Sequence, residues 1–180
     1  MDYDNDGWKD LLIAQGHVLD TIQQTFPHLR YLQPPLLLHG DGKKFTDVSA
    51  ASGEVFRRKW AARGLAVGDL DNDGLLDAVI TTNNGPAYVL HNNSSHEGHW
   101  LTLQLQGRIS NRDGIGAEVK MQENSGKFQY ATVSTASSYL SANDRRVHFG
   151  LGSSRSASVI EIHWPSGIVQ RLRDVPCDQI

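Results

Sequence analysis

The sequence predicts an all-β protein in two parts: a fragment of a β-propeller, then a compact antiparallel domain resembling a β-sandwich. A short aspartate-rich turn occurs twice, starting at Asp2 and again at Asp69, and apolar runs with high β-propensity adjoin both copies. Other short apolar runs, separated by Gly and Asn turns, lie between the copies, as in the four-stranded blades of a propeller. From about residue 97 the repeat stops, and apolar and polar residues alternate between turns.

Composition excludes several classes of protein. The chain has 180 residues, of which 39% are hydrophobic and 21% charged, as in ordinary soluble domains. No apolar run approaches the roughly 18 residues that would indicate a membrane span. The net charge is −3 and no basic stripe is present, so we expect no nucleic-acid partner. A single cysteine, Cys177, excludes an internal disulfide and a multi-cysteine zinc site, and we interpret it as an incidental or buried thiol.

The first part, residues 1–96, should contain the repeated unit. Its strands are expected at the apolar runs 11–13, 36–38, 45–48, 65–67, 78–81 and 88–90. Apolar residues at helical spacing within 18–33 predict a short helix or an irregular insertion, because Pro27 interrupts the pattern. The polar stretch 92–98 marks the boundary.

The second part, residues 97–180, should form five to seven short strands. Alternating patterns appear at 100–105, 119–121, 130–132 and 159–164, with Gly- and Asn-rich turns between them. Such a series predicts two facing sheets with a shared apolar core.

The repeated turns carry the clearest functional signal. Each has nine residues, with Asp at positions one, three, five and nine and Gly at position six. Calcium takes six to eight oxygen ligands, and this spacing can direct four carboxylates and the backbone carbonyl of position seven at one ion. We therefore predict two calcium sites. The first consists of Asp2, Asp4, Asp6, Trp8 and Asp10, and the second of Asp69, Asp71, Asp73, Leu75 and Asp77.

Other interpretations of these turns fit less well. A solvated acidic turn would leave four carboxylates repelling one another within nine residues. An EF-hand needs Glu at position twelve and flanking helices, whereas position twelve is Ile13 or Ile80 between β-prone runs. Magnesium prefers fewer carboxylates and keeps its waters. The ions should be structural, because the loop's own ligands leave little room for a substrate.

Longer motifs around the loops resemble known families. The first part, including "RGLAVGDLDNDGLLDAVITTNNG", resembles FG-GAP/VCBS repeats, which form propeller blades in secreted and cell-surface proteins. The motifs "HWLTLQLQGRISNRDGIGAEV", "SSYLSANDRRVHFGLG" and "VIEIHWPSGIVQRL" resemble the ASPIC/UnbV domain. That domain follows such repeats in bacterial proteins and in animal proteins of the cartilage acidic protein type.

The resemblance implies an extracytoplasmic calcium-binding protein that is extracellular, periplasmic or at the cell surface. A propeller needs roughly four to eight blades, and this chain has one complete repeat and part of another. No signal peptide is visible, and the first loop lacks a leading strand. We therefore expect a C-terminal piece of a longer protein, whose remaining blades, or another copy of the chain, would cover its edges.

Two polar connections in the second part are candidate ligand sites. One contains Asn111, Arg112 and Asp113, and the other Tyr139, Asn143, Asp144, Arg145 and Arg146. If they meet at one end of the sandwich, they form a small polar pocket; the structural interpretation is an Asx-type turn locked by an Arg–Asp pair. Trp164 should be core, although a surface aromatic there would stack on a sugar.

Three functions follow as hypotheses. The first is a non-enzymatic extracellular module for adhesion, or for binding a protein or glycan. The second is a carbohydrate-active enzyme fragment using Asp113 and Asp144, because glycosidases need two carboxylates about 5–10 Å apart. The third is a structural cap that closes the end of a propeller. The chain carries no HExxH, GxSxG, P-loop or dinucleotide-binding fingerprint.

Overall fold

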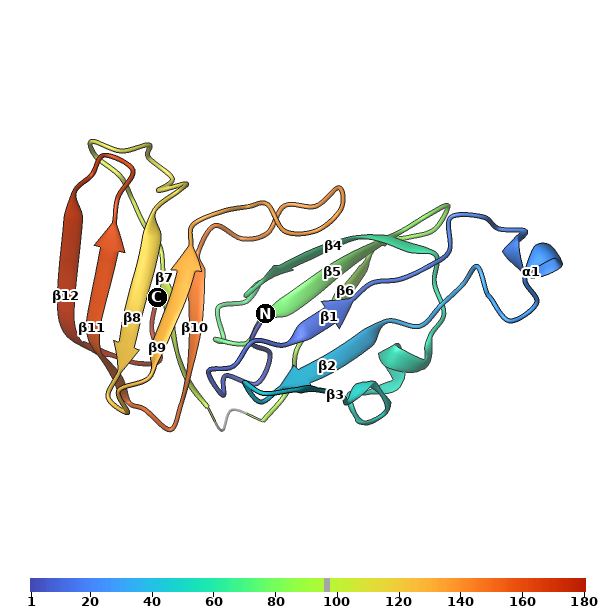
Figure 1. Ribbon diagram of the computed structural model, residues 1–180, viewed down its shortest axis with the longest axis horizontal. Helices are drawn as coiled ribbons and strands as arrows, with labels where there is room; N and C mark the ends of the chain where they lie inside the picture. Colours follow the sequence, from blue (N-terminus) through green and yellow to red (C-terminus); the bar gives the residue numbers. More distant parts are fainter. Residues whose placement is uncertain (96–97) are drawn as a thin grey trace.

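The structure is a computed structural model that describes residues 1–95 and 98–180. The first part holds two three-stranded antiparallel sheets (Figure 1). One sheet has the order β1-β2-β3, with β1 at Leu11–Ile13, β2 at Leu36–Gly40 and β3 at Phe45–Asp47. The other has the order β4-β5-β6, with β4 at Ala62–Gly68, β5 at Asp77–Thr82 and β6 at Tyr88–Leu90.

The second part is a sandwich of two antiparallel sheets. A two-stranded sheet pairs β7 (His99–Leu103) with β10 (Val147–Gly152). The larger sheet has the order β12-β11-β8-β9. Its strands are β8 (Glu118–Glu123), β9 (Phe128–Thr132), β11 (Ser156–His163) and β12 (Val169–Pro176).

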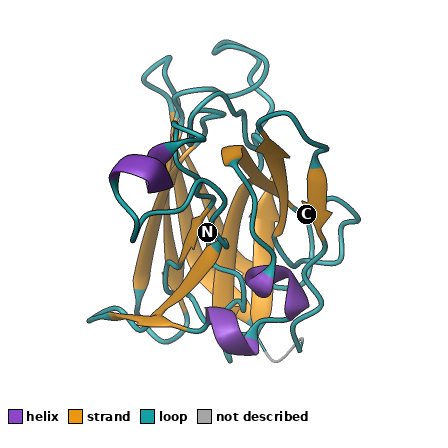
Figure 2. Ribbon diagram, turned by 90° about the vertical axis from the view of Figure 1, so that its right-hand side faces the viewer, coloured by secondary structure: helices purple, strands orange, loops and turns teal. Residues whose placement is uncertain are grey.

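The expected fold class is confirmed: the chain is all-β, with antiparallel sheets in both parts. Within the described residues no sheet closes into a ring. Helical structure is confined to connections (Figure 2): α1 at Ile22–Thr25 and 3₁₀ turns at Ser49–Ala51 and Glu54–Arg57. The helical pattern within 18–33 thus yields a single turn, consistent with the interruption at Pro27.

Each part has its own apolar core. Between the sheets of the second part, Phe149, Met121 and Ile160 are fully buried. Trp164 is partly buried against this cluster, and its indole Nε1 donates to Gln170 at 3.2 Å. In the first part a smaller cluster surrounds Ile80, and Trp60 stacks on Tyr88 with ring centroids 4.3 Å apart. The aspartate loops lie outside both cores.

Strand β10 passes so close to the first aspartate loop that it requires glycine. A Cβ on Gly150 would lie 2.3 Å from the carboxylate of Asp2 and 2.6 Å from Cα of Asn5. Glycines in the run Gly150–Ser153 are typical of a turn, but Gly150 and Gly152 lie inside the strand. Gly150 therefore marks a close approach of the strand to the loop, whereas Gly152 has a left-handed φ of 53°.

A long connection of the second part covers an edge of the first. The segment between β9 and β10 reaches back over the repeat part beside β4 (Figure 1), which is an edge strand of its sheet. Ser141 Oγ accepts from the N–H of Leu65 at 2.8 Å, and Asn143 Oδ1 accepts from that of Val67 at 2.9 Å. The backbone N–H of Asp144 donates to the Val67 carbonyl at 3.2 Å. These contacts satisfy backbone groups that an uncovered edge strand would present to other chains.

Candidate metal centres

The two aspartate loops have the same internal structure. The Asn at position four, Asn5 or Asn72, has a left-handed φ of 60° or 62°, and the glycine at position six has a φ of 84° or 88°. In both loops the Asp at position one accepts a hydrogen bond from that glycine N–H at 3.0 Å. The Asp at position five accepts from the N–H of position seven, at 2.7 Å and 2.8 Å. The repeat in sequence is thus a repeat in conformation.

Three carboxylates converge in each loop. Ligand oxygens of Asp2, Asp4 and Asp6 lie within 4.8 Å of one another, and so do those of Asp69, Asp71 and Asp73. The residue at position one is buried in both loops, with 0% of Asp2 and 3% of Asp69 exposed. Its second carboxylate oxygen, Oδ1, is buried and has no hydrogen-bond partner in either loop. A buried carboxylate oxygen without a hydrogen-bond donor is costly, so each loop has an acceptor that a bound cation could satisfy.

The Asp at position nine is placed differently. Both oxygens of Asp10 accept backbone N–H groups, from Tyr3 at 3.0 Å and from Gly40 at 2.8 Å. Asp77 likewise accepts from Leu70 at 3.0 Å and from Asn92 at 2.8 Å. The position-nine carboxylate therefore binds its loop to a backbone N–H group at or just after the end of a later strand, Gly40 at the end of β2 or Asn92 after β6.

A histidine stands beside each of these position-nine carboxylates. His39 Nδ1 lies 3.3 Å from Asp10 and 3.4 Å from Asp4. His91 Nδ1 lies 3.1 Å from Asp77 and 3.8 Å from Asp71. Positions three and nine of each loop thus face one another across an imidazole.

The residues at position seven share a backbone role but not a side-chain environment. Trp8 is 41% exposed, with Lys127 Nζ 3.6 Å from its ring centroid, whereas Leu75 is 1% exposed. The sequence repeat therefore reflects the needs of the turn and not a common packing partner.

Burial sets the electrostatics of the loops. It raises the pKa of Asp2 to about 7, with further raising by Asp6, Asp10 and Asp4. Burial also raises the pKa values of Asp4 and Asp69. Burial thus disfavours the ionised forms of Asp2, Asp4 and Asp69.

These residues fit a calcium ion. The possible metal-ligand atoms at positions one, three and five are all carboxylate oxygens, the ligand type that calcium takes. Oxygens around an ion at about 2.3–2.6 Å lie up to about 5 Å apart, which accommodates the 4.8 Å grouping. A cation would also supply the partner that Asp2 Oδ1 and Asp69 Oδ1 lack.

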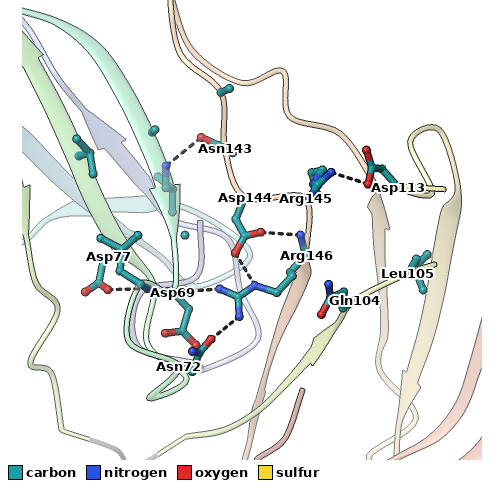
Figure 3. Close-up of a pocket in the computed structure, with 16 residues that line it drawn as sticks. Asp69, Asn72, Asp77, Gln104, Leu105, Asp113, Asn143, Asp144, Arg145 and Arg146 are labelled. Atoms are coloured by element: carbon teal, nitrogen blue, oxygen red, sulfur yellow. Dashed lines mark hydrogen bonds and ion pairs between the residues drawn. The ribbon is translucent and has the colours of Figure 1, made fainter. Parts of the chain in front are cut away.

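The Asn of each loop carries the contact to the second part of the chain. Asn5 is 1% exposed; its Nδ2 donates to the Gly74 carbonyl of the other loop at 2.9 Å, and its Oδ1 lies 2.7 Å from His148 Nε2. Asn72 Oδ1 accepts from the guanidinium of Arg146 at 2.5 Å. Arg146 also donates to the Asp69 carbonyl and pairs with Asp144 (Figure 3). Both loops are therefore bound by residues at the start of β10.

The Asn5 contact fixes the state of His148. Since Asn5 Nδ2 is the donor to Gly74, Asn5 Oδ1 faces the imidazole, and His148 donates through Nε2. His148 Nδ1 then accepts from the Thr102 hydroxyl at 2.9 Å. Burial, with Lys9 and Arg146 nearby, lowers the pKa of His148 to about 3. The neutral imidazole is thus the form that suits this contact.

A polar cavity lies between the second loop and the second part of the chain. It has a volume of about 650 Å³ and is lined by residues of β4, the second aspartate loop and the start of β10 (Figure 3). Asp113, Asp144 and Arg145 line it. Arg145 pairs with Asp113 at 2.6 Å, so the two polar connections do meet.

Three residues of those connections, Asn111, Arg112 and Tyr139, do not line the cavity. Asn111 bonds both backbone groups of Ile115, with its Nδ2 donating at 2.7 Å and its Oδ1 accepting at 2.8 Å. That pattern is a side-chain-locked turn. The side chains of Arg112 and Tyr139 are exposed.

Sequence reasoning missed Asn5, Asn72 and His148, and it gave Arg146 only a structural role in the second polar connection. The two Asn residues occupy equivalent positions in the repeat, which was visible, but a turn-forming role explained them fully. The contacts of Arg146 and His148 with the loops gave no signal, because nothing in the sequence shows that β10 lies against the loops.

Comparison with known families matches both parts. Residues 2–80 match the model for the FG-GAP-like repeat, and residues 107–180 match that for ASPIC and UnbV. The first part of the chain is thus similar to an FG-GAP-like repeat, and the second to an ASPIC/UnbV domain. Both aspartate loops lie entirely inside the repeat match, whereas Arg146 and His148 lie inside the other.

Two curated relatives are similar over part of the chain. Cartilage acidic protein 1 from Homo sapiens and that from Mus musculus are each 27% identical over 118 residues. The matched region covers 64% of this chain and 18% of each relative, so the chain corresponds to a small share of their length.

The raised pKa of Asp2 predicts a pH dependence in the metal-free protein. A carboxyl with a pKa of about 7 when folded and 3.8 otherwise contributes stability below pH 4 that is lost as pH rises through 7. In chelator, raising pH from 5 to 7.5 should cost wild type up to about 2.5 kcal/mol more than Asp2→Asn, which keeps the acceptor for Gly7 but cannot ionise. Urea unfolding at both pH values measures this. Equal pH dependence in the two proteins would refute the assignment.

Proposed function

We propose that this chain is a calcium-binding extracellular module for adhesion or ligand binding, in which two calcium ions have a structural role. The observation that carries the proposal is the unpartnered, buried Oδ1 of Asp2, repeated at Asp69. Two independent loops with the same unsatisfied acceptor and the same convergent carboxylates favour a common cation.

A structural role fits better than a catalytic one. At positions one, three and five, one oxygen of each carboxylate accepts a backbone N–H of its own loop. The ions would neutralise charge in turns that bear on the contact between the two parts. Removing them would leave the carboxylates around Asp2 and Asp69 to repel one another.

The family context supports an extracellular location. FG-GAP-like repeats and ASPIC/UnbV domains suggest an adhesion-type extracellular module. None of the helices in the described residues has the length and apolar character needed to cross a membrane. The cavity beside Asp113 and Asp144, with its mixture of carboxylates and guanidinium groups, is a candidate contact for a protein or glycan.

An enzymatic use of Asp113 and Asp144 is less well supported. Arg145 pairs with Asp113 at 2.6 Å and Arg146 with Asp144 at 2.5 Å. A glycosidase needs one of its two carboxyl groups protonated to act as an acid. Here both carboxylates are held in ion pairs with guanidinium groups.

Calcium titration tests the proposed function. Isothermal titration should give two calcium ions per chain for wild type and one for Asp69→Ala, because Asp69 is the buried carboxylate of the three that converge in the second loop. Asp41→Ala is the matched control and should keep two ions, since Asp41 caps an exposed turn outside both loops. Circular dichroism verifies the fold of each variant. Two ions of unchanged affinity in the Asp69 variant would contradict the proposal.

A second candidate function, a cap on the repeat, rests on the covered edge of β4. The connection between β9 and β10 satisfies the outward N–H groups of Leu65 and Val67 with side-chain oxygens. Unpaired edge strands template pairing between chains, so this cover would keep the blade from adding a further strand.

Removing the cap tests that role. Asn143→Ala should lose about 1 kcal/mol of stability, because the N–H of Val67 loses its acceptor, and should aggregate faster on partial unfolding. Asn124→Ala is the control, since the Asn124 side chain donates to Ser156 Oγ at 2.7 Å, within the second part of the chain. Light scattering during a thermal ramp compares the two. Identical aggregation would refute the capping role.

A further inference from the structure

One cluster of side chains lies apart from the aspartate loops and combines three types of metal ligand. His99 Nδ1, Cys177 Sγ and a carboxylate oxygen of Asp178 lie within 4.8 Å of one another. Asp178 Oδ2 is the common point, 2.8 Å from His99 Nδ1 and 3.2 Å from Cys177 Sγ. Imidazole nitrogen, thiolate sulfur and carboxylate oxygen are the three donors that bind zinc in proteins.

The backbone holds the three residues from different elements. His99 begins β7, while Cys177 and Asp178 belong to the tail that follows β12 and runs beside β7 (Figure 1). Asp178 N–H donates to the Trp100 carbonyl at 2.7 Å, and its Oδ1 accepts from the Trp100 N–H at 3.2 Å. Cys177 N–H donates to the Arg155 carbonyl at 3.1 Å. The ligands are therefore already gathered and need little ordering.

The spacing suits a tetrahedral ion. Zinc–ligand bonds of about 2.0–2.3 Å at tetrahedral angles put neighbouring ligand atoms roughly 3.3–3.8 Å apart. The His99–Asp178 and Cys177–Asp178 pairs, at 2.8 Å and 3.2 Å, would open by less than about 1 Å to admit the ion. His99 and Asp178 are 32% and 46% exposed, so an ion can enter from solvent.

We propose that His99, Cys177 and Asp178 form a three-ligand zinc site, with a water molecule in the fourth position. On binding, the Cys177 thiol gives its proton to solvent, and the sulfur–zinc bond replaces the S–H donated to Asp178. The site is distinct from the aspartate loops in location and in chemistry, since a thiolate selects zinc over calcium. It ties the C-terminal tail to the first strand of the ASPIC/UnbV domain.

Cobalt(II) is the probe that isolates this site. Cobalt bound by a thiolate has a sulfur-to-metal charge-transfer band, and Cys177 is the chain's one cysteine, so such a band reports this site alone. The full chain is titrated with cobalt in excess calcium, which occupies oxygen-only sites. We expect one equivalent of thiolate-bound cobalt, displaced by one equivalent of zinc.

Variants assign the three ligands. Cys177→Ser should abolish the band. His99→Gln and Asp178→Asn should each weaken cobalt binding by at least about 10-fold. Asn at 178 keeps an acceptor for Trp100, and circular dichroism verifies the fold. His163→Gln is the matched control, because His163 pairs with Glu161 at 2.5 Å in a surface contact without a thiol.

The absence of a one-equivalent band in wild type, or a band that His99→Gln leaves unchanged, would overturn the proposal. Should Asp178→Asn fail to fold, His99→Gln decides alone, since its side chain makes no backbone contact that holds the tail.

Discussion

The structure depends on two asparagine side chains that join the aspartate loops to one end of β10. Asn5 and Asn72 occupy the same position of the repeated turn, and both adopt a left-handed backbone conformation. Their oxygens are bound by His148 and Arg146, which lie two residues apart in the chain. Because Asn5 also bonds Gly74 of the other loop, the two loops and the ASPIC/UnbV domain form one connected contact.

This arrangement links charge in the loops to the union of the two parts. The loop carboxylates are gathered around buried acceptors without donors, and burial raises the pKa of Asp2 and Asp69. Arg146 donates to the backbone carbonyl of Asp69, so a change in the second loop's conformation acts directly on that contact. Strand β10 also lies against the first loop, and it needs glycine at position 150 because a side chain there would clash with Asp2 and Asn5. The loops therefore form part of the interface between the two parts of the chain.

The sequence predicted the fold class and the convergent part of each loop. Period-two patterns gave most strands, and the repeat of Asp spacing predicted that positions one, three, five and nine would converge, of which the structure gathers positions one, three and five around one point. The sequence did not predict that both carboxylate oxygens of Asp10 and of Asp77 accept hydrogen bonds from backbone N–H groups. One donor in each case, Gly40 or Asn92, is distant in sequence. Contacts between β10 and the loops join residues over 70 positions apart, and no local pattern reports them.

The same limit applies to the second part. Asp113 and Arg145 were each read as members of a polar turn, and only the fold shows them paired across a cavity. Gly150 and Gly152 look like a turn in the sequence. The structure shows that Gly150 is required because a side chain there would clash with Asp2 and Asn5 of the first loop, which the sequence does not reveal. Cys177 looks incidental until the tail is placed beside β7.

We propose that calcium in the two aspartate loops holds the two parts of the chain together. Hydrogen exchange with calcium and with chelator tests this proposal most directly. The informative amide is that of Gly152, which donates to the Asn5 carbonyl at 2.8 Å from the ASPIC/UnbV side. We expect calcium to slow exchange at Gly152 and the Asp144 amide, together with the loop amides of Gly7 and Gly74. The amide of Trp164, which donates to the Ile168 carbonyl at 2.9 Å within the sandwich, should not change. Slowing confined to the loops, with Gly152 and Asp144 unaffected, would contradict the account.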